Sequence, residues 1–213
     1  MSATVRRRHH AELRQLYAAR REAITSRLAE FSQVRPSEYF YELAYCLLTP
    51  QSSAEHAELA VDSLRQARFL ETGFDPAEIL ADRSRYVRFH RTKARRLLRL
   101  REHFERVPLA IEALPAPAEL RLWLATNVDG LGLKEATHFL RNIGRNGDLS
   151  ILDRHILRNL RRYGVLRSVP SSLSSKAYLR IERRFVGFAD EVEIPINHLD
   201  LLFWSLETGV IRK

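Results

Sequence analysis

The segment of residues 128–160 holds two side chains whose types and spacing could do chemistry, Lys134 and Asp153. Lys134 follows the stretch VDGLGL, in which Gly130 and Gly132 can take positive φ angles and let backbone amides approach a ligand closely. We therefore expect a helix, a tight hairpin suited to a phosphate, and a second helix. Lys134 would stand in the first turn of that second helix, where the positive end of the helix dipole disfavours an ammonium ion. A neutral, nucleophilic amine is then easier to reach.

Both side chains also have an ordinary structural interpretation. A lysine in the first turn of a surface helix is commonly a solvated charge. An aspartate just before an amphipathic run is a preferred N-cap, because its oxygen accepts a backbone amide hydrogen bond. For Asp153 the two roles are compatible, since a carboxylate fixed by helix amides stays ionised and could stabilise positive charge on a reacting sugar.

The motifs GLGLKEATHFLRNIG (130–144) and ILDRHIL (151–157) resemble the helix-hairpin-helix DNA glycosylases that also cleave the strand, in particular the second, archaeal-type family of 8-oxoguanine DNA glycosylases. Three further segments are similar to the same family: LLTPQSSA (47–54), YVRFHRTKARRL (86–97) and LLFWSLETGVIRK (201–213). The resemblance implies an all-α fold of two helical subdomains with the active site in the cleft between them. It also implies a base-excision repair enzyme that flips out and removes 8-oxoguanine and then nicks the strand 3′ to the abasic site by β-elimination.

The resemblance implies that Lys134 attacks C1′ of the damaged nucleoside and forms a Schiff base, and that Asp153 assists this step. This chemistry needs no organic cofactor, and we expect no metal ion in it. Hairpins of related proteins bind a monovalent cation through backbone carbonyls. Such a cation would lie around Leu131 to Leu133 in this chain.

The predicted base pocket draws on three parts of the chain. In the last helix the predicted core stripe is Leu199, Leu202, Phe203 and Leu206. Trp204 shares a different face with Asn197, Asp200 and Leu201, although a second packing face explains that spacing equally well. The resemblance implies that Trp204 and Phe89 stack on the flipped base; core packing is an equal alternative for Phe89. The resemblance also gives Lys213 a part in base recognition. The Lys213 carboxylate could accept the N7 hydrogen that distinguishes 8-oxoguanine from guanine. A frayed end is the alternative for Lys213.

Other residues are candidates for contact with the DNA strand. The resemblance implies that Gln51 enters the duplex near the vacated position, with a solvent-exposed loop residue as the alternative. The hairpin amides at Gly130 and Gly132 would bind phosphates. Arg154, at the start of the predicted helix that follows Asp153, would contact the DNA backbone, and we interpret His155 as a helix-surface or phosphate-facing side chain rather than a catalytic base.

Composition supports a nucleic-acid partner. The 213-residue chain carries a net charge of +9, with a pI of about 10.2, and the basic residues are spread along the fold. An excess of positive charge favours a polyanion, here double-stranded DNA containing 8-oxoguanine or abasic sites. The single cysteine, Cys46, excludes an intrachain disulfide or a four-cysteine iron–sulfur cluster and is assigned to packing.

Apolar periodicity predicts helices almost throughout and no strand. The clearest runs follow Pro36 and lie at about 93–104, 117–126, 174–187 and 195–207. We expect one DNA glycosylase/lyase unit over residues 1–213, with a central subdomain at about 41–144 and residues 1–40 packed with 145–213. No stretch approaches the roughly 20 apolar residues of a membrane span, and the N-terminus lacks a signal core. We therefore expect an intracellular protein in the cytoplasm or nucleoid. We also expect it to act as a monomer.

Two other functions fit parts of the pattern. A helix-hairpin-helix glycosylase for oxidised pyrimidines would share Lys134 and Asp153. A noncatalytic DNA-binding module would keep the hairpin and the basic surface but would not need the pair, so the presence of both residues argues against it.

Overall fold

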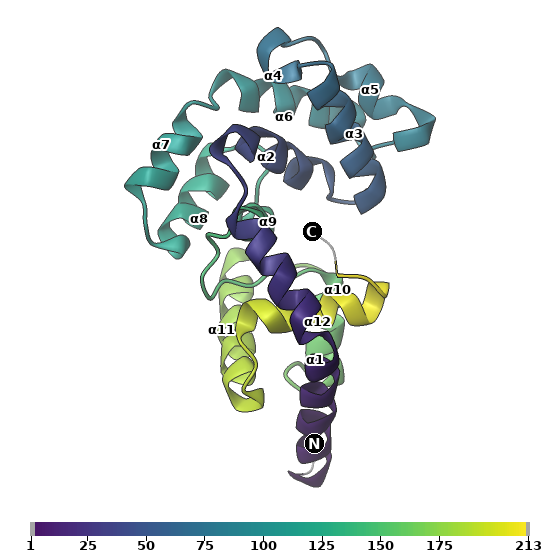
Figure 1. Cartoon of the computed structure of the whole chain (residues 1–213), viewed down its shortest axis with the longest axis vertical. Helices are drawn as coiled ribbons and strands as arrows, with labels where there is room; N and C mark the ends of the chain where they lie inside the picture. Colours follow the sequence, from purple (N-terminus) through teal and green to yellow (C-terminus); the bar gives the residue numbers. More distant parts are fainter. Residues whose placement is uncertain (1–2, 212–213) are drawn as a thin grey trace. The chain divides into compact units, whose positions relative to one another are not determined.

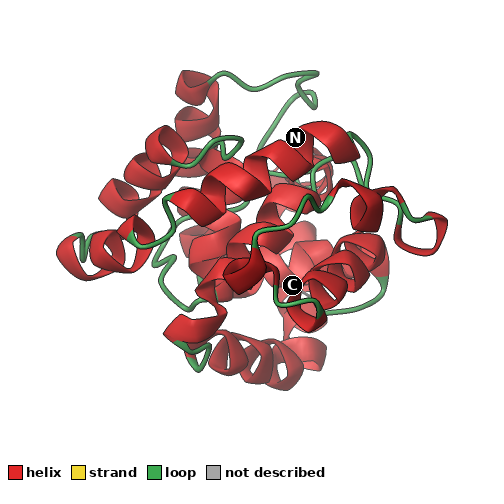
Figure 2. Ribbon diagram, turned by 90° about the horizontal axis from the view of Figure 1, so that it is seen from above, coloured by secondary structure: helices red, strands yellow, loops and turns green. Residues whose placement is uncertain are grey.

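The structure of the chain is a computed structural model that describes residues 3–211, with side chains from Arg6 onward. All its regular elements within that range are helices, and none is a strand (Figure 2). The all-α class predicted from the apolar periodicity is therefore confirmed. None of the helices described is long and apolar enough to cross a membrane.

The chain divides into two compact units. The terminal unit contains residues 1–33 and 144–213, and the central unit contains residues 34–143. The central unit begins at Val34 rather than near residue 41, because the short 3-10 helix η1 (Pro36–Glu38) packs with the helix that follows it.

The terminal unit is built around its last helix. It consists of α1 (Ala3–Ser32), α10 (Arg154–Arg162), α11 (Ser175–Val192) and α12 (Ile196–Thr208), and α12 contacts each of the other three (Figure 1). Phe203 of α12 is fully buried, and its ring stacks on Tyr163 and Phe185 with centroid distances of 5.5 Å to both. Such a stack fixes the position of α12 in its unit.

The central unit is organised around α2 (Tyr39–Leu48), which packs against α3 (Ala54–Gln66), α6 (His90–Glu102) and α9 (Leu133–Asn142). Every residue from Phe40 to Leu48 is buried, including Cys46, whose predicted packing role is confirmed. A helix buried on all sides must satisfy its polar groups internally. The Glu42 carboxylate accordingly accepts a hydrogen bond from Asn142 Nδ2 at 3.0 Å. The remaining elements are α4 (Phe69–Thr72), α5 (Ala77–Ala81), η2 (Arg83–Arg85), α7 (Arg106–Ala113) and α8 (Pro117–Asn127).

The long predicted helices are confirmed, with ends shifted by a few residues. Apolar periodicity does not predict α4, α5 and α7, which have at most eight residues each. A helix of one or two turns gives too few apolar repeats for a periodicity to be recognised. Arg68 and Gly73, both left-handed, bound α4 and make it a single turn.

Candidate active site and DNA-contacting residues

The predicted hairpin connects α8 to α9 and is confirmed. Gly130 has a φ of 91°, which residues with a side chain rarely adopt, and a Cβ atom there would lie 2.5 Å from Arg96 Cδ, so that any other residue would displace the Arg96 side chain. The positive φ expected at Gly132 is wrong: its φ is −102° and its ψ is −173°. Gly132 is the N-cap of α9, and an N-cap residue has an extended backbone.

Lys134 lies in the first turn of α9, as predicted, and its side chain is 32% exposed. Its Nζ forms an ion pair of 3.1 Å with Glu135 Oε1. The other carboxylate oxygen of Glu135 accepts the Gly132 amide hydrogen at 3.1 Å. One carboxylate therefore joins the candidate nucleophile to the hairpin amide. The sequence did carry a signal for this contact, because a glutamate three residues after an N-cap is the pattern of a capping box.

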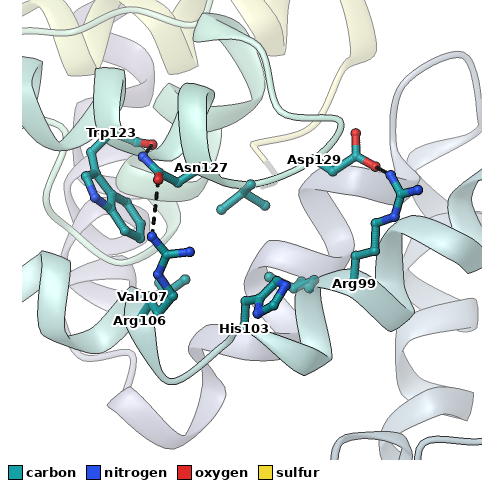
Figure 3. A pocket seen from close by; sticks show the side chains of 9 residues that line it. Arg99, His103, Arg106, Val107, Trp123, Asn127 and Asp129 are labelled. Carbon is teal, nitrogen blue, oxygen red and sulfur yellow. Dashed lines mark hydrogen bonds and ion pairs between the residues drawn. The ribbon is translucent and has the colours of Figure 1, made fainter.

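A small cavity lies beside the hairpin within the central unit (Figure 3). Trp123 and Val128 line it, and Arg99 at its rim donates to Asp129 Oδ2 at 2.6 Å. Its volume of about 90 Å³ is far below the roughly 300 Å³ at which ligand pockets begin. This cavity is therefore too small for a nucleoside, and the residues around it support the hairpin instead.

Asp153 is the N-cap of α10, which confirms the structural part of its prediction. Its Oδ1 accepts the Ile156 amide hydrogen at 2.8 Å. The side chain is thereby held by backbone at the start of the helix, which fixes the direction of the carboxylate.

Three buried side chains hold the segment immediately before Asp153. The amide hydrogens of residues 150, 151 and 152 are accepted by Glu182 Oε1 at 3.1 Å, Asp200 Oδ2 at 2.8 Å and the Tyr178 hydroxyl at 3.2 Å, respectively. The Tyr178 hydroxyl also donates to the Ser150 carbonyl at 2.7 Å. The three residues are at most 7% exposed. We call this group the acceptor clamp.

In the acceptor clamp Asp200 binds a backbone amide, a contact that was not predicted from the sequence. The sequence placed this residue in the base pocket, whereas in the structure it is 3% exposed and binds backbone. The division of α12 into faces is also partly wrong. Leu201, expected on the Trp204 face, is fully buried, and Leu206, expected in the core stripe, is only partly buried. Contacts of α12 with three other helices explain why more than one of its faces is covered.

Trp204 is partly buried and meets the ring of His155 edge to face, with centroids 6.3 Å apart. His155 in turn lies 3.7 Å from Glu207, which also accepts from Asn159 Nδ2 at 3.4 Å. Trp204 therefore contacts a cluster of polar side chains of the terminal unit. Glu207 belongs to this cluster and was not predicted from the sequence. Arg154 is exposed at the start of α10.

Gln51 and Phe89 occupy two strained turns of the central unit. Both have positive φ angles, 57° and 61°, which residues with a side chain seldom adopt. Gln51 is exposed, and Phe89 is 50% exposed with the Arg88 guanidinium 4.9 Å above its ring. Core packing, the alternative considered for Phe89, is therefore wrong. Lys213 lies outside the described residues.

Comparison with known proteins identifies the family. A family model described as 8-oxoguanine DNA glycosylase matches residues 24–194. The chain belongs to the 8-oxoguanine DNA glycosylase family. It is 37% identical to an 8-oxoguanine DNA glycosylase/AP lyase of Fusobacterium nucleatum, over 95% of this chain and 96% of the relative. It is 39% identical to the one of Korarchaeum cryptofilum, over 91% of each chain.

Solved structures of the 8-oxoguanine DNA glycosylase family have the same fold. A Methanocaldococcus jannaschii 8-oxoguanine glycosylase/lyase in complex with a 15mer DNA containing 8-oxoguanine is 30% identical, with a TM-score of 0.85 over 96% of this chain and 99% of that one. The 8-oxoguanine DNA glycosylase of Thermotoga maritima is 28% identical, with a TM-score of 0.83 over 98% and 100%. The predicted helix-hairpin-helix glycosylase fold is thus confirmed.

Proposed function

We propose that this chain excises 8-oxoguanine from double-stranded DNA and then cleaves the strand 3′ to the abasic site. The observation that carries the proposal is the position of Lys134, in the first turn of α9 directly after a glycine hairpin. The names of the relatives support both activities, and they favour 8-oxoguanine over an oxidised pyrimidine. Membership in a catalytic family argues against a noncatalytic DNA-binding module.

In the proposed reaction the neutral amine of Lys134 attacks C1′, and the bond from C1′ to N9 of the base breaks. The base leaves with the electron pair of that bond and takes up a proton. Opening of the sugar ring gives a Schiff base between Nζ and C1′. The Schiff base acidifies the C2′ hydrogen, whose removal expels the 3′ phosphate by β-elimination.

Asp153 would assist base loss as an ionised carboxylate. Positive charge develops on the sugar as the bond to the base breaks, and a fixed negative charge nearby stabilises it. The hydrogen bond from the Ile156 amide holds one oxygen of the carboxylate in place, so the group needs little reorganisation when the charge appears. The acceptor clamp extends this order to the backbone before it.

The proposed contacts with DNA come from both units. The hairpin amides at Gly130 and Gly132 bind a phosphate of the strand, and Gln51 enters the duplex where the base has left. Arg154 and His155 contact the backbone. The exposure of Gln51 and Arg154 and the closely packed glycine turn support these assignments.

The base itself would lie between aromatic faces, because a flipped base loses its stacking neighbours in the duplex. Phe89 and Trp204 are proposed for this role, and the half-exposed ring of Phe89 supports it. Lys213 completes the proposed pocket, with its carboxylate accepting the N7 hydrogen of the lesion, whereas Asp200 acts through the acceptor clamp. A monovalent cation at the carbonyls of 131–133 and action as a monomer at the nucleoid belong to the same proposal.

Borohydride trapping tests the proposal directly, because it reduces an imine to a stable bond. Wild-type protein and Lys134→Gln are incubated with a duplex containing 8-oxoguanine, and the covalent protein–DNA product is measured by denaturing gel. We expect trapping with the wild type and none with the variant. Lys176→Gln, which changes an exposed lysine of α11, is the matched control and should be trapped normally. Equal trapping of Lys134→Gln would exclude Lys134 as the nucleophile.

A further inference from the structure

A buried lysine with no role in the proposed chemistry lies in α6. The residue Lys93 is 3% exposed, and its Nζ donates to the Leu48 carbonyl at 2.6 Å, the Pro50 carbonyl at 2.7 Å and Ser52 Oγ at 3.1 Å. An ammonium group has three hydrogens, so these acceptors use all of them. They lie on both sides of Gln51. Lys93 therefore fixes the course of the turn that carries Gln51.

The same contacts reach the turn that carries Phe89. Ser52 Oγ, which accepts from Lys93, also accepts the Arg88 amide hydrogen at 3.0 Å. The Phe89 carbonyl accepts the backbone amide hydrogen of Lys93 at 3.0 Å. One side chain and one hydroxyl thus connect the Gln51 turn with the Phe89 turn, and both of these residues have a strained backbone.

Those strained residues explain why such support is needed. A left-handed backbone at a residue with a side chain persists only where its surroundings determine it strongly. Without Lys93, the carbonyls of Leu48 and Pro50 would lose their common donor, and Gln51 could relax from its φ of 57°. A relaxed turn would then have to be ordered again on each encounter with DNA.

The charge of Lys93 fits this role. Burial, with smaller contributions from Arg96 and Lys134, lowers the pKa of Lys93 to about 8. A pKa of about 8 still leaves most of the lysine protonated at neutral pH, so that three donors are available. A buried charge is costly unless it is well paired, and here the paired groups are the oxygens of the Gln51 turn.

We propose that Lys93 is a positioning residue, which holds the Gln51 and Phe89 turns in the conformation that engages DNA when the lesion is flipped out. The inference rests on the proposed function, from which Gln51 and Phe89 take their contacts with DNA and base. Lys93 acts through these turns and does not touch the substrate.

The test compares a duplex in which 8-oxoguanine is base-paired with a duplex in which it has no pairing partner. Lys93→Met keeps a long side chain and removes the donors. Single-turnover excision is measured on 8-oxoguanine paired with cytosine and on 8-oxoguanine opposite an abasic site, where no base pair has to be broken. We expect Lys93→Met to slow the paired substrate by about 10- to 100-fold, as misplacement of a positioning group does, and the unpaired substrate by much less. Lys176→Met should change neither rate.

A double-mutant cycle with Gln51→Ala tests the route of the effect. If Lys93 acts through the Gln51 turn, adding Lys93→Met to Gln51→Ala should cost much less than it costs in the wild type. Additive losses would overturn the inference, as would equal slowing of Lys93→Met on both duplexes, the result expected of a general loss of fold.

A milder variant keeps the test decisive if Lys93→Met does not fold, as judged by circular dichroism. Ser52→Ala leaves the lysine in place and removes only the oxygen that joins the two turns, so we expect a smaller loss with the same preference for the paired substrate. Failure of wild type to be trapped by borohydride would instead contradict the proposed function. Normal trapping together with the absence of substrate preference in both variants would contradict only the role of Lys93.

Discussion

The central unit fixes its turns with a buried cation, whereas the terminal unit fixes the segment before Asp153 with buried hydrogen-bond acceptors. Lys93 satisfies two backbone carbonyls, and the acceptor clamp satisfies three backbone amides. The backbone between helices has no ladder partner, so its polar groups need side chains when they are buried. The type of side chain that binds a buried segment therefore depends on which backbone groups are buried. Carbonyls require a donor such as Lys93, and amides require acceptors such as those of the acceptor clamp.

The largest expected effect separates the charge of Asp153 from its capping bond. Asp153→Asn retains a good N-cap, so the free energy of unfolding should change little, but it removes the negative charge that we propose acts on the reacting sugar. We expect excision of 8-oxoguanine to slow by about 10²-fold or more, the usual size of a lost electrostatic contribution. Single-turnover rates and thermal unfolding are measured together. Asp148→Asn, the same change at an exposed residue of this unit, should alter neither. A drop in stability with normal excision would show that Asp153 is only a cap.

A smaller effect should follow from breaking the acceptor clamp. Tyr178→Phe removes the hydroxyl that donates to the Ser150 carbonyl and accepts from the Leu152 amide. Buried groups left without partners cost about 1–3 kcal/mol, so the free energy of unfolding should fall by about that amount in denaturant titrations. Hydrogen exchange at Leu152 should become faster. Tyr86→Phe, at a residue that is 45% exposed, should have no such effect. Unchanged exchange at Leu152 would argue that the clamp does not order this segment.

The smallest expected effect is a pH dependence that belongs to the central unit. The pKa of Lys93 is about 8 in the folded chain and 10.5 in the unfolded one, so between these values the unfolded chain binds more protons. The free energy of unfolding attributable to Lys93 should therefore rise with pH, by about 1 kcal/mol between pH 8 and 9. The measurement is the difference in pH dependence between Lys176→Met and Lys93→Met. A zero or opposite difference would mean that the lysine does not titrate below its ordinary range.

Features encoded over a few residues could be predicted from the sequence. The hairpin, the place of Lys134 in the first turn of α9 and the capping bond of Asp153 each depend on neighbours within about one helical turn. The roles of Phe89 and Gln51 were predicted from the resemblance to the family, because residue spacing alone left alternatives open.

Contacts between distant residues could not be predicted in this way. Lys93 meets a carbonyl 45 residues away, and Tyr178 meets one 28 residues away. Nothing in the local pattern distinguishes such a lysine or tyrosine from one on the surface. Glu135 is the intermediate case, because its capping contact has a local signal but its ion pair with Lys134 does not.

Glu135 gives the hairpin a built-in competitor for its own ligand. One carboxylate accepts the Gly132 amide hydrogen and forms an ion pair with Lys134. The free protein therefore already carries an anion where the proposed phosphate would bind. A phosphate that takes the amide must displace the carboxylate, and the lysine nitrogen then loses its ion-pair partner. Docking of the strand and release of the nucleophile would be two results of a single exchange of anions.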